Sequence, residues 1–174
     1  MKNQIIQDLR AGKVVTVPTE TVEGYAVALD SERAVRELMR MKDRGFDSGK
    51  IFTLVPESVE AIVKYVLIPP AAQALIDKYV PGELTLILPK NPEFSHFYYD
   101  EFARRGMKIG IGIRMPKYPL FEEILSEVGP LMLTSANPRG GVPRSVTGHR
   151  PSTVVDFTGV SPRILRQGDL VLDL

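Results

Sequence analysis

Cysteine is absent from the 174 residues of this chain. A chain without cysteine has no disulfide, no thiolate metal site and no cysteine nucleophile. The sequence also lacks any apolar run near the about 20 residues that a membrane-spanning helix requires. Its first residues are typical of an amphipathic helix rather than of a secretion signal. We therefore expect a soluble cytoplasmic protein that has no membrane partner.

The sequence also has no large excess of positive or negative charge, because 22 Lys and Arg residues balance 21 Asp and Glu residues and leave a net charge of +1. A nucleic-acid partner would have to bind a local basic patch, since the overall field is weak. The apolar fraction of 44% is ample for a hydrophobic core. The length fits one domain, which we place at residues 1–174.

Several catalytic motifs are missing as well. The sequence has no G-x-x-x-x-G-K-[ST] phosphate loop, no G-x-G-x-x-G and no G-x-S-x-G. Ser135-Ala136-Asn137 is similar to the S-x-N element of penicillin-recognising enzymes, but neither S-x-x-K nor K-T-G accompanies it. His96 and His149 lie in polar stretches that are typical of solvated loops. These patterns exclude the commonest nucleotide-binding and hydrolase sites.

Apolar runs that stop at proline or glycine alternate with helical periodicities along most of the chain. The expected strands are Lys13–Val17, Tyr25–Leu29, Ile51–Val55, Leu84–Leu88, Lys108–Met115, Leu131–Leu133, Thr153–Phe157 and Arg163–Leu165. The expected helices are 2–11, 31–41, 58–65, Pro70–Tyr79 and Pro119–Val128. We interpret Lys90–Met107 as a surface excursion and Arg139–Pro151 as a loop. The alternation predicts an α/β sheet with some antiparallel pairs.

Lys13–Gly24 is the most informative stretch, because a β-branched strand ends at Pro18 and hydroxyl and carboxylate side chains follow. Polar groups also follow other elements of the chain. They are Thr19, Thr21, Lys42, Arg44, Arg114, Ser135, Asn137, Ser152, Thr153 and Arg166. Each position alone has an ordinary structural explanation, such as a turn or a helix C-terminus. Together they predict a crevice for an anion with many acceptor oxygens, such as a nucleotide triphosphate with a carboxylate.

Six motifs, in order, resemble those of YrdC-like threonylcarbamoyl-AMP synthases. They are Pro18–Gly24, Lys42–Arg44, Ile113–Pro116, Thr134–Asn137, Pro151–Asp156 and Ile164–Gly168. The resemblance implies a twisted, open, mixed sheet with flanking helices and a concave basic cleft. It also implies an L-threonylcarbamoyladenylate synthase, a nucleotidyltransferase. That enzyme converts ATP, L-threonine and bicarbonate to threonylcarbamoyl-AMP and pyrophosphate, the first step of forming N6-threonylcarbamoyladenosine in tRNA.

The resemblance also implies roles for individual residues. The catalytic residues would be Lys42, Arg44, Ser135 and Asn137. The ATP-binding residues would be Lys42, Arg44, Thr134, Ser135, Asn137 and Arg166. The threonine-binding residues would be Thr19, Thr21, Arg114 and Ser152. Mg²⁺ is expected to accompany ATP, with no side chain assigned as its ligand, and tRNA or a threonylcarbamoyl-transferase is an expected partner.

The sequence departs from the family pattern at several places. Glu23 stands where the family motif usually has tyrosine, and Gly45 replaces a usual proline. The segment between Asn137 and Ser152 is shorter than usual, and we expect no further C-terminal domain. Phe52–Pro56 resembles YciO-like relatives. Two alternatives therefore stay open: a non-catalytic RNA- or nucleotide-binding module, and a YciO-type relative that acts on a related carbamoyl product.

Overall fold

The computed structural model describes residues 2–107, 110–137, 141–142 and 148–172. These residues form a mixed α/β fold, as the alternating pattern predicts. In chain order the elements are α1 (Lys2–Arg10), β1 (Val15–Val17), β2 (Gly24–Ala28), α2 (Glu32–Met41), the 3-10 turn η1 (Phe46–Ser48), β3 (Thr53–Val55), α3 (Ile62–Tyr65), α4 (Pro70–Tyr79), β4 (Leu84–Pro89), α5 (Phe97–Arg104), β5 (Gly110–Ile113), α6 (Pro119–Val128), β6 (Leu131–Ser135), β7 (Thr153–Asp156) and β8 (Arg163–Arg166). None of the helices in these residues is long and apolar enough to cross a membrane.

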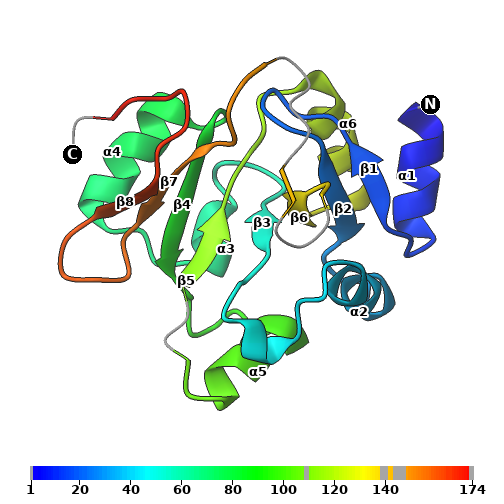
Figure 1. The fold of residues 1–174 in the computed structure, drawn as a ribbon, viewed down its shortest axis with the longest axis horizontal. Coiled ribbons are helices and arrows are strands. Elements are labelled where there is room, and N and C mark those ends of the chain that lie inside the picture. The colour runs from blue at the N-terminus through cyan, green and yellow to red at the C-terminus, as the bar shows by residue number, and fades with distance from the viewer. Residues whose placement is uncertain (1, 108–109, 138–140, 143–147, 173–174) are drawn as a thin grey trace.

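The strands form one open, twisted sheet in the order β1-β2-β6-β3-β5-β4-β7-β8 (Figure 1). The β3–β5 and β4–β7 pairs are parallel, and the other neighbours are antiparallel. The register places Gly24 of β2 opposite Ser135 of β6. Segments far apart in the sequence are therefore neighbours in the sheet, which brings the polar ends of several strands together.

Helices α2, α3, α4 and α5 cover one face of the sheet. Their buried side chains pack with Leu54, Leu86, Ile113 and Met132 from the central strands. Because side chains alternate between the faces of a strand, the intervening residues point to the other side. This face therefore carries the larger of the two cores and leaves the polar strand positions to the opposite face.

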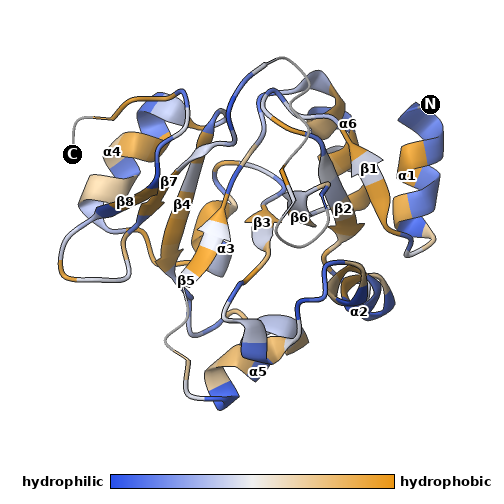
Figure 2. Cartoon of the chain, viewed as in Figure 1, coloured by the Kyte–Doolittle hydropathy of each residue, from blue (hydrophilic) through white to orange (hydrophobic). Residues whose placement is uncertain are grey.

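The opposite face is only partly covered. At the β1–β2 end, α1 and α6 pack on it through Leu9, Phe121 and Ile124. Both helices carry apolar residues and polar ones, as amphipathic surface helices do (Figure 2). Arg10 and Glu127 form an ion pair between the two helices. Among the described residues, no helix lies over the middle of this face (Figure 1).

The interpretation of Lys90–Met107 as a surface excursion is wrong. Tyr98, Tyr99 and Phe102 of α5 are fully buried in the larger core. The Tyr98 hydroxyl accepts a hydrogen bond from the backbone N–H of Phe52 at 3.1 Å, and the two rings stack with centroids 5.4 Å apart. This aromatic packing anchors the chain just before β3.

Smaller differences concern element ends. The helix expected from Ser58 begins at Ile62, and Ser58 instead accepts a hydrogen bond from the Ala61 N–H. His96, expected in a solvated loop, caps the N-terminus of α5 and contacts the carbonyl of Leu29 at 2.8 Å. Residues 108–109 of the expected strand at Lys108–Met115 and most of the expected loop at 139–151 lie outside the described residues.

Candidate functional site

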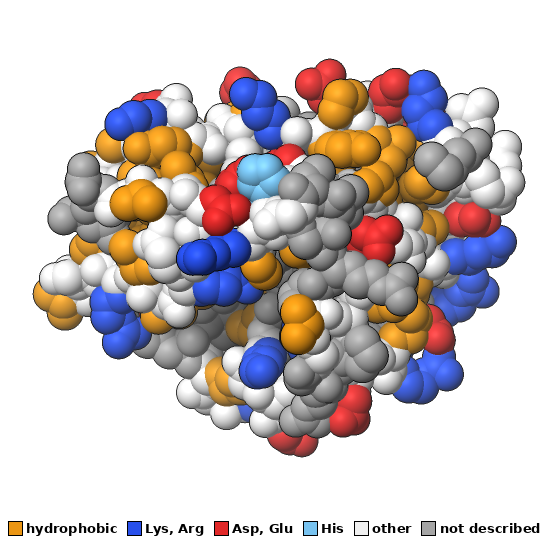
Figure 3. All heavy atoms as spheres, turned by 45° about the horizontal axis from the view of Figure 1, so that its top comes forward, with side chains coloured by type: hydrophobic (Ala, Val, Ile, Leu, Met, Phe, Trp, Pro, Cys, Tyr) orange, Lys and Arg blue, Asp and Glu red, His pale blue; other side chains and the backbone are white. Residues whose placement is uncertain are grey.

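A pocket of about 440 Å³ opens on the uncovered face of the sheet. Figure 3 shows the molecule hollowed near the middle of this side, with basic side chains at the rim. The pocket is lined by Thr19, Val22, Glu23, Gly24, Arg44, Gly49, Ile51, Thr53, Thr85, Ile87, Met107, Gly110, Gly112, Arg114, Leu133, Thr134, Ser135, Pro151, Ser152, Val154, Asp156, Thr158 and Arg166. The lining comes from strands in the middle of the sheet and from the loops at their ends.

Two glycines of β5 form part of the pocket wall. A Cβ at Gly110 would lie 2.4 Å from Cγ2 of Ile87 and 2.6 Å from Cγ2 of Thr158. A Cβ at Gly112 would meet nothing closer than Thr53 Oγ1 at 3.6 Å. Gly110 is therefore required for close packing, whereas a Cβ at Gly112 would make only ordinary van der Waals contacts.

Arg114 follows β5 and is 7% exposed. Its Nη2 donates to Thr21 Oγ1 at 2.8 Å and lies 3.2 Å from Oε1 of Glu20. Its Nε is buried and has no hydrogen-bond partner among the described residues. The guanidinium is thus held from one side by the loop after β1, and Arg114 lines the pocket, where a guanidinium suits an anionic ligand.

Thr19 shapes that loop. Its hydroxyl donates to the carbonyl of Val22 at 2.7 Å and accepts from the backbone N–H of Thr21 at 3.1 Å. Such side-chain-to-backbone bonds close a turn without glycine. The turn begins directly after Pro18, where the expected strand ends, and it fixes Thr19 and Thr21 beside Arg114.

Lys42 and Arg44 are separated by a sharp reversal at the end of α2. The backbone N–H of Arg44 donates to Met39 O and that of Asp43 to Arg40 O, which is a Schellman motif with Asp43 in the left-handed region at φ 45°. Asparagine and aspartate adopt this conformation more readily than other non-glycine residues. After the reversal both cations reach the end of β6, where Lys42 contacts Ser135 and Arg44 contacts Thr134.

The ammonium of Lys42 lies beneath the pocket and not in its lining. Lys42 is 1% exposed, and its Nζ donates to Ser135 O at 2.9 Å, to Asn137 O at 2.5 Å and to Asn137 Oδ1 at 3.5 Å. Burial, together with the charge of Arg44, lowers the pKa of Lys42 to about 8. Lys42 therefore holds the turn that follows β6.

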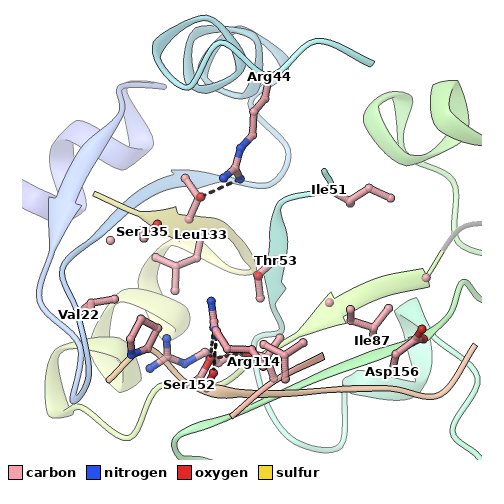
Figure 4. Close-up of a pocket in the computed structure, with 18 of the residues that line it drawn as sticks. Val22, Arg44, Ile51, Thr53, Ile87, Arg114, Leu133, Ser135, Ser152 and Asp156 are labelled. Atoms are coloured by element: carbon pink, nitrogen blue, oxygen red, sulfur yellow. Dashed lines mark hydrogen bonds between the residues drawn. The ribbon is translucent and has the colours of Figure 1, made fainter. Parts of the chain in front are cut away.

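Arg44 does line the pocket. Its Nη1 donates to Thr134 Oγ1 at 3.2 Å, and its guanidinium lies over the ring of Phe52 at 5.6 Å. Figure 4 shows Arg44 entering from one side of the cavity, with Arg114 and Ser152 on the opposite side. The two guanidinium groups thus face the same space from different elements.

Arg166 of β8 is the third arginine that lines the pocket, after Arg44 and Arg114. Its Nε donates to Ser152 O at 2.9 Å and its Nη2 to Ser152 Oγ at 3.1 Å, while Ser152 Oγ lies 2.8 Å from Thr85 Oγ1. Desolvation and the nearby charge of Arg114 lower the pKa of Arg166. Like charges brought this close favour an anion between them.

Seven of the ten site residues expected from the sequence line the pocket: Thr19, Arg44, Arg114, Thr134, Ser135, Ser152 and Arg166. Thr21, Lys42 and Asn137 do not, but Thr21 holds Arg114 and Lys42 holds Asn137. Sequence reasoning missed Thr53, Thr85 and Asp156, which line the pocket from within strands. The period-two alternation in those strands was the available signal.

One group of side chains in the described part of the chain has a spacing suited to a metal ion. Glu83, His149 and Asp169 place one ligand atom each within 4.8 Å of one another. None of the three lines the pocket, and Asp169 accepts a hydrogen bond from the Arg150 N–H. The group joins the chain before β4 to the segments that flank β7 and β8.

Comparisons with known proteins show what the chain is similar to. The family model for the Sua5/YciO/YrdC domain, described as "Telomere recombination", matches residues 7–147. The chain is 32% identical over 170 residues to the threonylcarbamoyl-AMP synthase of Stenotrophomonas maltophilia, a match that covers 97% of this chain and 83% of that protein. The YrdC-like resemblance of the six motifs is thereby confirmed.

Solved structures share the fold. The crystal structure of P. abyssi Sua5 complexed with L-threonine superimposes with a TM-score of 0.79 at 27% identity. The match covers 97% of this chain and 54% of that one, so this chain spans about half the length of that protein. E. coli YciO superimposes with a TM-score of 0.76 at 21% identity, over 97% of this chain and 89% of that one, and shows the shared fold. With the family model matched over most of its length, the chain belongs to the Sua5/YciO/YrdC family.

Proposed function

We propose that this chain is an L-threonylcarbamoyladenylate synthase, a nucleotidyltransferase that uses ATP, L-threonine and bicarbonate. One observation carries the proposal: Arg44, Arg114 and Arg166 reach a single pocket together with several hydroxyl groups. Such a pocket suits a ligand that combines phosphates with a carboxylate. The synthase name of relatives about 30% identical over most of the chain supports the same reaction.

The reaction forms two bonds. The uncharged amine of threonine attacks the carbon of CO2, and the nitrogen loses a proton as the carbamate forms. If bicarbonate is attacked instead, its hydroxyl group leaves as water together with that proton. A carbamate oxygen then attacks the α-phosphorus of ATP, and pyrophosphate leaves with the electrons of the broken P–O bond. Negative charge gathers on phosphoryl oxygens, so fixed cations and oriented donors are the main catalytic requirement.

We assign the nucleotide to Arg44, Thr134, Ser135 and Arg166, with Asn137 and Lys42 setting the turn after β6. Threonine is assigned to Thr19, Arg114 and Ser152, with Thr21 holding Arg114. Mg²⁺ supplies charge neutralisation when it is bound to the triphosphate. The carboxylates in the lining are Glu23 and Asp156, but Asp156 is engaged by Thr158 and Arg163, and we assign no side chain as a ligand of the cation. Cytoplasmic location and a tRNA or transferase partner stay predictions from the resemblance.

The reaction itself is the direct test. The chain is incubated with MgATP, L-threonine and bicarbonate, and pyrophosphate release and product mass are measured. We expect pyrophosphate only when all three substrates are present, with a product of the mass of threonylcarbamoyl-AMP. A different product mass would support the YciO-type alternative, and salt-sensitive tRNA binding without turnover would support the binding module.

The pocket wall gives a second prediction. Replacing Gly112 with valine should weaken ATP binding about 10-fold, because its Cβ would make only ordinary contacts with Thr53 and Thr85 while the added methyl groups would take up pocket volume. The melting temperature should change little, since valine suits a strand. Gly110→Val is the matched comparison and should lower stability, because its Cβ would overlap Ile87 and Thr158. Calorimetry with ATP and thermal denaturation measure both effects, and unchanged ATP affinity in Gly112→Val would place the ligand elsewhere.

A further inference from the structure

The charged side chains of the pocket are not all cations. The charged residues of the lining are Glu23, Arg44, Arg114, Asp156 and Arg166. Asp156 is already engaged: its Oδ1 accepts from the N–H and the hydroxyl of Thr158 at 2.9 and 2.7 Å, and its Oδ2 lies 3.3 Å from Arg163 Nη2. The carboxylate of Glu23 makes no hydrogen bond or ion pair with any described residue. Glu23 is therefore the free carboxylate of the pocket lining.

The backbone fixes Glu23 against the turn after β6. Its carbonyl accepts the N–H of Ala136 at 2.8 Å, and the next residue, Gly24, pairs with Ser135. A Cβ at Gly24 would lie 2.6 Å from Cδ1 of Leu133, so the two strands are closely packed here. The backbone of Glu23 thus belongs to a closely packed part of the wall.

Glu23 is also close in the chain to the groups that hold Arg114. Thr21, two residues earlier, accepts the hydrogen bond from Arg114 Nη2. A carboxylate that has no partner among the described residues and a guanidinium thus line the same pocket, one from the loop after β1 and the other from the end of β5. These two charges are complementary to those of an α-amino acid, which carries an ammonium and a carboxylate on the same carbon.

We propose that the Glu23 carboxylate accepts the ammonium group of the amino-acid substrate, while Arg114 takes its carboxylate. The inference rests on the proposed function. It adds the protein group, the Glu23 carboxylate, that recognises the ammonium by which an amino acid differs from other carboxylates. A buried ammonium without an acceptor is costly, so the pocket requires such an oxygen. The position matters because the resembling motif usually has tyrosine there, which carries no charge at neutral pH.

Calorimetry with two ligands of the same carbon skeleton tests the inference. L-threonine carries the α-amino group, and 3-hydroxybutanoate lacks it. The wild-type protein should bind threonine more tightly than 3-hydroxybutanoate. In Glu23→Gln, threonine binding should weaken about 10- to 100-fold, the effect of one hydrogen bond to a charged group, whereas 3-hydroxybutanoate binding should not weaken. Glu23→Asp should recover part of the threonine affinity.

Glu122→Gln, an exposed glutamate of α6, is the matched control and should bind threonine as the wild type does. The melting temperature of Glu23→Gln should match the wild type, because Glu23 has no partner to lose among the described residues. Unchanged threonine affinity in Glu23→Gln would overturn the assignment, as would a rise in the KM for MgATP alone, which would indicate a Mg²⁺ ligand. A folded wild-type chain that neither binds threonine nor releases pyrophosphate would overturn the proposed function as well.

Discussion

Replacing Lys42 with methionine is expected to lower kcat/KM for ATP by about 100-fold, the effect of losing one or two hydrogen bonds from a charged donor. Methionine keeps the length of the stem and removes the ammonium that bridges Ser135 O, Asn137 O and Asn137 Oδ1. The turn that presents Ser135 to the pocket would then lose its anchor. Steady-state pyrophosphate release at varied ATP concentration measures the effect.

Stability should fall less than activity in this variant. Burial of the ammonium carries a desolvation cost, which is why the pKa of Lys42 is lowered to about 8. Methionine removes that cost together with the hydrogen bonds. Lys64→Met, on the exposed face of α3, is the control and should leave both activity and melting temperature near the wild type. Full activity in Lys42→Met, or an activity loss matched by global unfolding, would contradict the assignment of Lys42 to the turn.

The pH dependence has a definite sign. In the folded chain the ammonium loses its proton as pH rises through about 8, whereas in the unfolded chain it keeps the proton to its ordinary value of 10.5. Activity that depends on the charged bridge should therefore fall above pH 8, and this limb should be missing in Lys42→Met. Between these two values the unfolded state binds more protons, so the contribution of Lys42 to stability rises with pH. An activity loss above pH 8 without a parallel loss of stability would identify the ammonium of Lys42 as the group that titrates.

Replacing Arg114 with lysine should lower kcat/KM for threonine by about 100-fold, because an ammonium cannot reproduce the planar fork of donors. The Nη2 of the guanidinium donates to Thr21 Oγ1 and faces Glu20, and the same residue lines the pocket. A lysine would satisfy Glu20 or the substrate but not both. Initial rates at varied threonine concentration report the loss, and Arg36→Ala, an exposed residue of α2, should show none.

The role of Arg114 in folding can be separated from its role in binding. Arg114→Ala removes the ion pair with the mostly buried carboxylate of Glu20, which should lower the free energy of unfolding by about 3 kcal/mol. Adding Glu20→Gln in the same chain should restore most of that stability but not the activity. Recovery of activity in the double variant would mean that Arg114 acts only through the loop.

Strand and helix positions were largely predictable from local chemistry. Proline ends the strands before Pro18 and Pro56, and α4 begins at Pro70 as expected. The order of the strands was not predictable, because the pairing of β6 with β2 and of β7 with β4 depends on distant segments. Helix α5 was missed because aromatic and charged residues alternate irregularly there. The spacing of Tyr98 and Phe102, one helical turn apart, was the signal that could have found it.

Most residues of the site were predictable from the sequence, but the separate positions of Lys42 and Arg44 relative to the pocket were not. Lys42 and Arg44 stand two apart in the sequence, which suggests two equivalent cations. The left-handed conformation of Asp43 separates them, so that Arg44 lines the pocket and Lys42 lies beneath the turn at Ser135. Nothing in the residue types reveals that conformation, because aspartate is not a residue that demands it.

The pocket draws Thr19 from the loop after the first strand of the chain and Arg166 from the last. A ligand that contacts both ends of this path can bind only when the intervening chain has folded. Substrate saturation should therefore prolong the life of the whole molecule, because a ligand at 100 times its Kd adds about 2.7 kcal/mol against global unfolding. Proteases that attack the transiently opened chain would then remove the unliganded protein first, and its abundance would follow the supply of its substrates.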